Sequence, residues 1–378
     1  MTNNIMNNPT KHMAIFLPGL YDGGAERVML NLAAGLVEYG FKVDLVLAQA
    51  EGAYMDEIPA SVRLVELNKR HTSARRTLSS LPSLVRYLRL ERPDAMLSCL
   101  NYANVIALWA RRLSGVPFRI TISEQNTFSS ERDQLPARYR WPIYGMMKLV
   151  YPWADAITAV SEGAADDLAS VLSIPREHIQ VIYNPIITPE LQVKKDAPLE
   201  DPWFGENQPP VVLAVGRLTK QKGFDTLIQA FAKVRRLREV HLLILGEGED
   251  RLSLLNLLRE LKLEQDVRLP GFVSNPYQYM ANASMFVLSS RWEGLPTVLV
   301  EALYCGASLV ATDCPSGPRE ILKNGQYGQL VPVDDADCLA QAINSALDKK
   351  ALPISPPSWQ AFELSNVIKQ YVKTLLGN

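Results

Sequence analysis

The sequence predicts an α/β protein built from two Rossmann-like, doubly wound domains that face each other across a cleft. Two observations lead to this fold class. The chain has 378 residues, which is more than one ordinary hydrophobic core accommodates. In each half, short apolar runs alternate with stretches of helical periodicity, and this alternation is typical of parallel sheets covered by helices on both faces.

The first half contains seven apolar runs that we expect to be strands. They cover residues 14–18, 42–47, 63–67, 95–98, 119–123, 155–160 and 180–183. Apolar residues recur at helical spacing in residues 25–33, so we expect an amphipathic helix after the first strand.

The composition then changes, and six prolines fall within 26 residues, at positions 185, 189, 198, 202, 209 and 210. Proline-rich stretches are typical of linkers between domains. Strand-like runs resume at residues 210–216, 241–246, 267–271, 285–289 and 308–312. We therefore assign residues 1–190 to a first domain and 191–357 to a second. We expect a C-terminal helix, at about residues 358–378, to pack back on the first domain.

Composition excludes several classes of protein. Net charge is −1 and the apolar fraction is 47%, which fits a soluble globular protein and gives no bulk signature of nucleic-acid binding. The four cysteines are scattered without a CxxC pair, which argues against a zinc site or a disulfide framework and favours a reducing compartment. We find no signal-peptide pattern in the polar first residues and no apolar run long enough to span a bilayer, so we expect a cytoplasmic protein.

The first motif with chemical content is the segment from Gly216 to Gly223, which follows a predicted buried strand. It places Arg217 and Lys222 five residues apart on a turn. A fork-shaped guanidinium together with an ammonium suits a diphosphate. The alternative is that both cations are ordinary surface charges.

The second motif places Glu293 and Glu301 on either side of a predicted helix start. Pro296 is typical of a first helical turn, and Gly306 just beyond Cys305 is typical of a helix end. The amides at the start of such a helix form an anion site, and they belong to Leu295, Thr297 and Val298. The alternative for Glu301 is a solvated helix residue.

Together these segments resemble the retaining GT-B glycosyltransferases of family 4, and the resemblance covers nearly the whole chain. Five segments carry it in order: the loop 23–26, Val160-Ser161-Glu162, Tyr183-Asn184-Pro185, Gly216-Arg217-Leu218, and the Glu293…Glu301 pair. The order and spacing of the last two make the resemblance specific.

The resemblance implies that Glu293, Arg217 and Lys222 are the catalytic residues. Arg217 and Lys222 would bind the donor diphosphate and stabilise the leaving group, Glu301 would hold the ribose, and Glu293 would contact the sugar hydroxyls. The implied donor-binding residues are Gly23, Gly24, Arg217, Lys222, Gly246, Val273, Glu293, Leu295, Pro296, Thr297 and Glu301. The implied acceptor-side residues are Glu26, Gln125 and Asn126.

The resemblance also implies a reaction that retains the anomeric configuration without a protein nucleophile, a cofactor or a metal ion. The donor would be a nucleotide-sugar, with UDP favoured over GDP by family usage. It would carry a hexose or N-acetylhexosamine destined for a surface polysaccharide. One position departs from the family pattern: many relatives carry a histidine where this chain has Gln125, and glutamine can form a hydrogen bond there but cannot titrate.

Residues 63–148 contain 15 Lys and Arg against 6 Asp and Glu, which indicates either an anionic partner for the first half or an ordinary solvated surface. Two basic stretches rich in apolar or aromatic residues lie within or next to this region. Their cations are Arg75, Arg76, Arg86, Arg89, Arg92, Arg132, Arg138, Arg140 and Lys148. Such mixtures can rest on anionic headgroups, so we expect peripheral association with the inner face of the cell membrane and a glycan or lipid-diphosphate-linked saccharide as acceptor. The alternative is core packing with the arginines reaching outward.

Several other functions compete with sugar transfer. Gly246-Glu247-Gly248 resembles a dinucleotide loop, but the third glycine is missing and acids occupy the phosphate approach, which argues against an NAD oxidoreductase. A GDP-mannose-type mannosyltransferase, a UDP-sugar epimerase and a non-catalytic sugar-nucleotide binding module of the same fold remain open.

Overall fold

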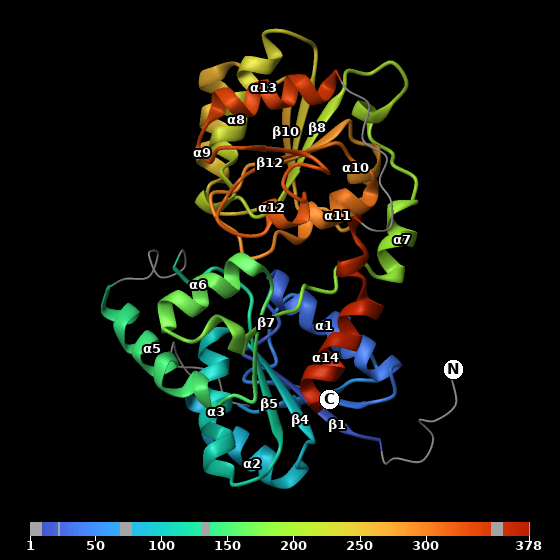
Figure 1. Ribbon diagram of the computed structural model, residues 1–378. Helices are drawn as coiled ribbons and strands as arrows, with labels where there is room; N and C mark the ends of the chain where they lie inside the picture. Colours follow the sequence, from blue (N-terminus) through green and yellow to red (C-terminus); the bar gives the residue numbers. More distant parts are fainter. Residues whose placement is uncertain (1–9, 22, 69–77, 130–136, 349–357, 378) are drawn as a thin grey trace. The chain divides into compact units, whose positions relative to one another are not determined.

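The computed structural model describes residues 10–21, 23–68, 78–129, 137–348 and 358–377 (Figure 1). The chain forms two compact units. The first contains the residues up to Pro185 together with those from Leu364 onward, and the second is Ile186–Glu363. The chain therefore passes from one unit to the other twice, at residues 185–186 and 363–364.

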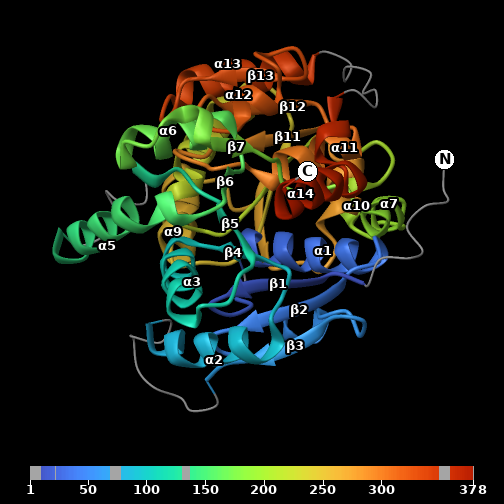
Figure 2. The same cartoon turned by 60° about the horizontal axis from the view of Figure 1, so that its bottom comes forward.

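The first unit is built on a parallel sheet in the order β3-β2-β1-β4-β5-β6-β7 (Figure 2). Its strands are β1 (His12–Leu17), β2 (Lys42–Leu47), β3 (Arg63–Glu66), β4 (Ala95–Cys99), β5 (Arg119–Glu124), β6 (Ala156–Ala159) and β7 (Ile179–Val181). All seven predicted strands are confirmed. The central strands β1 and β4 are buried along their whole length, which explains why they read as unbroken apolar runs.

Helices cover both faces of this sheet. They are α1 (Gly24–Glu38), α2 (Leu81–Glu91), α3 (Asn101–Ser114), α5 (Ala137–Val150), α6 (Glu162–Leu172) and α14 (Leu364–Leu376). The predicted amphipathic helix after β1 is α1. The C-terminal helix α14 packs on α1 in the same core. Contact is close at Gly35, where an added Cβ would lie 2.8 Å from Cδ1 of Ile368.

The second unit repeats the architecture with a parallel sheet in the order β10-β9-β8-β11-β12-β13. Its strands are β8 (Val211–Val215), β9 (His241–Leu245), β10 (Val267–Gly271), β11 (Met285–Leu288), β12 (Leu309–Thr312) and β13 (Gln329–Val331). Five of these were predicted. The sixth, β13, has three residues of which only Val331 is buried, so it lacks the apolar run that identified the others.

The helices of the second unit lie on both faces of its sheet. They are α8 (Phe224–Arg235), α9 (Arg251–Leu261), α10 (Pro276–Asn282), α11 (Thr297–Cys305), α12 (Pro318–Ile321) and α13 (Ala336–Leu347). Residues of α8, α9 and α13 form one core with the strands. Helices α10 and α11 pack on each other and contact β8, β11 and β12 on the other side.

From Ile186 onward, the proline-rich stretch is ordered and belongs to the second unit. It contains α7 (Pro189–Lys195) and a 3₁₀ turn at Pro202–Phe204. The Trp203 ring stacks on His241 at a centroid distance of 4.1 Å, and the guanidinium of Arg268 lies 3.7 Å from the Trp203 ring centroid. These contacts fix the stretch to the starts of β9 and β10.

Candidate functional site

The predicted residues of the second unit follow four neighbouring strands of its sheet. Arg217 follows β8, Gly246 follows β9, Val273 follows β10 and Glu293 follows β11. Because the strands are parallel, their carboxyl ends share one edge of the sheet. The order reverses between β8 and β11, and ligands of doubly wound sheets bind at such switch points.

The loops after β8 and β11 bring Lys222 and Glu293 together. Nζ of Lys222 donates a hydrogen bond of 2.6 Å to Oε1 of Glu293, and Oγ of Ser290 donates to the same oxygen at 2.6 Å. The Lys222 and Glu293 side chains are 17% and 7% exposed. The sequence predicted a ligand contact for each residue, but it did not predict that their charges balance each other.

A buried thiol stands close to this pair. Burial, and then the nearby carboxylate of Glu293, raise the pKa of Cys314 to about 12. The thiol therefore stays protonated at neutral pH and adds no charge to the site.

Arg217 lies at the same edge but is exposed, whereas Leu218 next to it is fully buried. Its position after β8 places it at the carboxyl ends of the strands. Val273 is half-buried, and its neighbour Phe272 is 81% exposed.

Two glycines of these loops are required by backbone packing. Gly246 has φ +140°, and an added Cβ would overlap the carbonyl oxygen of Gly216. An added Cβ on Gly248 would overlap the backbone of Leu218. The resemblance implied a ligand contact for Gly246, but the contact between the loops demands glycine there whether or not a ligand is bound.

Helix α11 begins and ends where the sequence predicted. Pro296 precedes its first residue, and Gly306 ends it in the left-handed region at φ +92°. Leu295 and Pro296 are buried, while Thr297 is half-buried.

The start of α11 is held by the segment before α12. Oγ of Ser316 donates to the carbonyl of Gly294 at 2.8 Å. Glu301 lies half-buried within α11, more than one turn from its start, so Glu293 and Glu301 can contact different parts of an extended ligand.

In the first unit, the predicted acceptor-side residues also lie where strands end. Gln125 and Asn126 follow β5, and Glu26 lies in the first turn of α1, just after β1. Glu26 is 7% exposed, and its carboxylate occupies the space that a Cβ on Gly23 would need. Among the described residues, no atom lies within 4 Å of a Cβ added to Gly24.

Gln125 is held in one orientation. Its side chain is 7% exposed, and Nε2 donates to Oγ of Ser123 at 2.9 Å. Its Oε1 is buried and has no hydrogen-bond partner among the described residues. Gln125 therefore holds a buried hydrogen-bond acceptor at this position.

A buried polar cluster next to Gln125 was not found from the sequence. Glu124 is 4% exposed and accepts hydrogen bonds from the Tyr151 hydroxyl and from Nδ2 of Asn104, the latter at 2.9 Å. Burial, and then the Glu124 carboxylate, raise the pKa of Tyr151 well above its usual value, so its hydroxyl remains a donor. The sequence signal for this cluster was Glu124, a carboxylate at the end of an apolar strand. No sequence pattern identified Asn104 or Tyr151 as its partners.

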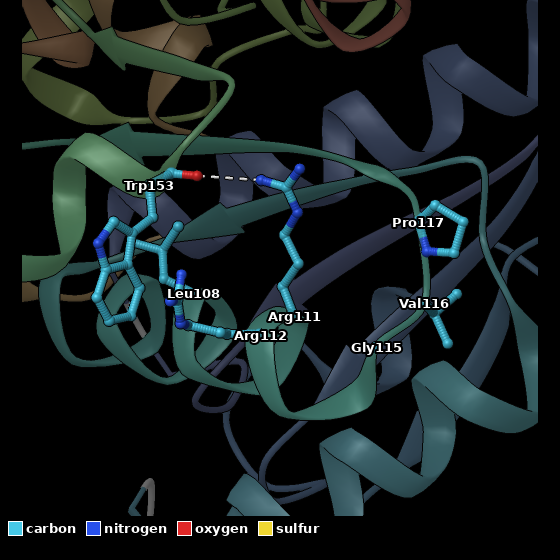
Figure 3. Close-up of a pocket in the computed structure, with 7 residues that line it drawn as sticks. All are labelled: Leu108, Arg111, Arg112, Gly115, Val116, Pro117 and Trp153. Atoms are coloured by element: carbon cyan, nitrogen blue, oxygen red, sulfur yellow. Dashed lines mark hydrogen bonds between the residues drawn. The ribbon is translucent and has the colours of Figure 1, made fainter.

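A surface pocket of about 420 Å³ lies elsewhere in the first unit (Figure 3). Arg111 donates to the Trp153 carbonyl at 3.0 Å and pairs with Asp155, and the Arg112 guanidinium lies 5.0 Å from the Trp153 ring centroid. The pocket lies beside the end of α3 and the start of β5. Gln125 follows the other end of β5, and the pocket includes no predicted site residue.

The basic stretches have mixed roles. Arg89 donates to the carbonyls of Leu113 and Ser114 at 2.9 and 3.2 Å, so it caps the end of α3. On α5, Met146 and Leu149 are 37% and 61% exposed. Three predicted contacts, Arg75, Arg76 and Arg132, lie outside the described residues, as do the side chains of residues 138–141. Within the described part of the chain, no helix is long and apolar enough to cross a bilayer.

An Asp-x-Asp sequence, which can mark a metal site, does occur at residues 335–337. In the structure Asp335 caps α13 by accepting from two backbone amides, and Asp337 pairs with Lys233 at 2.5 Å. Both carboxylates therefore have structural partners. The described ranges contain no group of three His, Cys, Asp or Glu side chains placed to hold a metal ion.

Comparison with known proteins defines the class. Residues 22–189 match the model of Glycosyltransferase Family 4, and residues 200–361 match that of Glycosyl transferases group 1. The chain belongs to the GT-B glycosyltransferases of family 4.

Individual relatives agree with this assignment. The chain is 33% identical to the Campylobacter jejuni N-acetylgalactosamine-N,N'-diacetylbacillosaminyl-diphospho-undecaprenol 4-alpha-N-acetylgalactosaminyltransferase, over 97% of this chain and 99% of that protein. It is 29% identical to the lipopolysaccharide core biosynthesis glycosyltransferase LpsE of Rhizobium meliloti, over 88% and 87%. The crystal structure of Anabaena HepE in complex with UDP-glucose superimposes with a TM-score of 0.77 at 19% identity, covering 97% of this chain and 100% of that one.

Proposed function

We propose that this glycosyltransferase moves a hexose or N-acetylhexosamine from a UDP-sugar to a lipid-diphosphate-linked saccharide, with retention of configuration, during assembly of a bacterial surface glycan. The Lys222–Glu293 pair at the switch-point edge of the second unit carries the proposal. It combines a cation for a diphosphate with a carboxylate for hydroxyl groups.

The donor would lie along the carboxyl ends of β8, β9, β10 and β11. Arg217 and Lys222 would bind the diphosphate, Glu301 the ribose and Glu293 the transferred sugar. Because Lys222 pairs with Glu293 in the free protein, donor binding must redistribute this hydrogen bond between the carboxylate and the diphosphate.

The proposed reaction exchanges two bonds at the anomeric carbon. The bond to the diphosphate oxygen breaks, and the acceptor hydroxyl oxygen bonds to the same face of the carbon. The hydroxyl proton passes to a diphosphate oxygen. Negative charge grows on the leaving diphosphate, and fixed cations at Arg217 and Lys222 would stabilise it in the transition state. No metal ion is required in this scheme.

The relatives support the choice of acceptor. One is named for transfer to a diphospho-undecaprenol saccharide and another for lipopolysaccharide core biosynthesis. The exposed Met146 and Leu149 on α5 and the exposed Arg86 and Arg92 would contact an anionic membrane surface. Peripheral association with the inner face of the cell membrane follows from this proposal.

The first test measures the thermal midpoint of the full chain with UDP, GDP, ADP and dTDP in the presence of EDTA. We expect a selective increase with UDP. A selective increase with GDP would instead favour the mannosyltransferase alternative. No increase with any nucleotide would contradict the donor site.

Turnover separates transfer from epimerisation. The assay follows UDP release from a panel of UDP-hexoses and UDP-N-acetylhexosamines, with and without undecaprenyl-diphosphate-linked saccharides. We expect release that depends on the acceptor and an α-linked product by NMR. Lys222→Met and Glu293→Gln should each lower kcat/KM about 100-fold or more, whereas the exposed Glu264→Gln should not change it.

A further inference from the structure

Arg291, which has no assigned role, connects the loops that carry the two members of the Lys222–Glu293 pair. It lies two residues before Glu293, and its side chain is 15% exposed. Its guanidinium donates from all three nitrogens. Nε donates to Asp334 at 2.7 Å, Nη2 to Asp225 at 2.8 Å and Nη1 to the carbonyl of Lys220 at 2.7 Å.

The loop after β11 donates hydrogen bonds to three successive backbone carbonyls of the turn that carries Lys222. The Lys220 carbonyl accepts from the Arg291 side chain at 2.7 Å. The Gln221 carbonyl accepts from the Arg291 backbone amide at 2.7 Å. The Lys222 carbonyl accepts from Oγ of Ser289 at 2.8 Å. The position of the Lys222 backbone is therefore set by the same loop that places Glu293.

The backbone around this contact adopts conformations that side chains disfavour. Asp334 has φ +57°, in the left-handed region. Gly223 has φ +62°, and a Cβ there would overlap the carbonyl of Ser289. Non-glycine residues in the left-handed region, such as Asp334, persist where surrounding contacts hold them, and they concentrate at functional sites; glycine adopts this region readily. Here these conformations allow Asp334 to reach Arg291 and the Lys222 turn to approach the β11 loop.

Arginine is suited to this position for a geometric reason. A planar guanidinium donates in three fixed directions, whereas the ammonium of a lysine is a single point charge on a flexible chain. The charge of Arg291 is balanced by Asp225 and Asp334, so it does not supply the positive charge proposed for the diphosphate. Its contribution is the placement of its neighbours.

We propose that Arg291 is a positioning residue for the donor site, which holds the Lys222 turn at the separation from Glu293 that a nucleoside diphosphate-sugar requires. This inference rests on the proposed function, because Lys222 is assumed to contact the donor diphosphate.

The test compares full-length Arg291→Lys with the unchanged protein. Lysine keeps the positive charge, but it cannot reproduce the three hydrogen bonds that the guanidinium donates to Asp334, Asp225 and the Lys220 carbonyl. We expect the dissociation constant for UDP, measured by calorimetry, to increase about tenfold, and kcat/KM for the donor to fall about 10- to 100-fold, because small displacements of a positioned group cost this much. Both are measured well below the thermal midpoint of the variant. Arg238→Met, which removes the ion pair with Asp348 on the second unit, is the matched control and should change neither quantity.

A double-mutant cycle distinguishes positioning from general stabilisation. If Arg291 acts through Lys222, then Arg291→Lys should weaken UDP binding little further in a Lys222→Met background. Additive losses in the two backgrounds would overturn the inference. Asp334→Asn provides a second route should Arg291→Lys fail to fold, and it should weaken UDP binding in the same non-additive manner.

The outcomes also separate this inference from the proposed function. If the unchanged protein binds neither UDP nor GDP, the donor site and the role of Arg291 fail together. If it binds UDP and Arg291→Lys binds and turns over equally well, only the role of Arg291 fails.

Discussion

Asp44 is a single buried carboxylate that joins three elements of the first unit. Its side chain is 0% exposed. It accepts a hydrogen bond from Nε of Arg63 on β3 at 2.8 Å and from the Tyr87 hydroxyl on α2 at 2.7 Å, and it contacts His12 on β1. Burial raises the pKa of Asp44, but the hydrogen bonds from Arg63, His12 and Tyr87 outweigh burial and hold the pKa well below its usual value.

We predict that Asp44 contributes stability that is lost in acid. A lowered native pKa stabilises the folded state above the unfolded value of about 4, and this contribution decreases as the pH falls below it. Asp44→Asn should lower the free energy of unfolding by about 1.5–3 kcal/mol at pH 7, because it removes the charge-assisted hydrogen bond from Arg63. In urea titrations at pH 7, 5, 4 and 3, the difference between the two proteins should shrink below pH 5. Asp56→Asn, at an exposed position, should show no such trend, and a constant difference for Asp44→Asn would contradict the prediction.

Lys222 and Glu293 show what could and could not be predicted for a single residue. Both were singled out because cations and carboxylates next to a strand end and a helix start suit a nucleotide-sugar. They are 71 positions apart, so their mutual contact depends on the adjacency of β8 and β11 in the sheet. The same limit applies to Glu124, Asn104 and Tyr151, which come from three separate elements.

At the scale of elements, the strands were predicted more reliably than the contacts that the loops between them make. Most of the twelve predicted strands were recognisable because strands buried on both faces consist of continuous apolar residues. The strands β3 and β7 were also predicted, although most of their residues are not buried. The start and end of α11 followed from Pro296 and Gly306. The turn at Lys220–Lys222 was recognisable only as a turn. Its three carbonyls accept hydrogen bonds from the loop after β11, and the sequence did not predict these contacts.

Helix α14 depends on a close approach to α1 at Gly35. An added Cβ would lie 2.8 Å from two carbons of Ile368 and 3.1 Å from Leu364. We predict that Gly35→Val lowers the free energy of unfolding by about 1–3 kcal/mol because it overpacks this contact. Ile368→Ala shortens the opposing side chain. Adding Gly35→Val to Ile368→Ala should therefore lower the free energy of unfolding by less than Gly35→Val does in the unchanged protein.

Gly145→Val is the matched control for this prediction. Gly145 lies in α5, and no atom of the described residues comes within 4 Å of an added Cβ, so a branched side chain meets none of them. The change should be less than about 1 kcal/mol. Equal destabilisation at both positions would show that loss of glycine in a helix, and not the α1–α14 contact, is responsible.

At the scale of the whole molecule, the chain forms two units with separate cores. Each is a parallel sheet whose strand order reverses near its middle, and each carries predicted site residues at the carboxyl ends of its strands. The proposed donor contacts lie mainly in the second unit, so a ligand bound there should stabilise that unit selectively.

We predict that UDP slows amide hydrogen exchange mainly in the second unit. Protection should increase at residues 216–223 and 293–301 and remain unchanged at β2 and β3 of the first unit. At a UDP concentration 100 times its dissociation constant, the added stability is about 2.7 kcal/mol. ADP serves as the control. Protection confined to the first unit would contradict the assigned donor site.

The sequence by itself determined the fold class, the two repeats and the residue types of the candidate site. These follow from local patterns: apolar runs, prolines and glycines at helix ends, and charged residues directly after strands. The tertiary structure decided which of these residues meet, because contacts such as Lys222 with Glu293, Arg291 with Asp334 and Gln125 with Ser123 depend on strand order, loop packing and burial. Strand order is a global property of the chain, and no local pattern in this sequence encodes it.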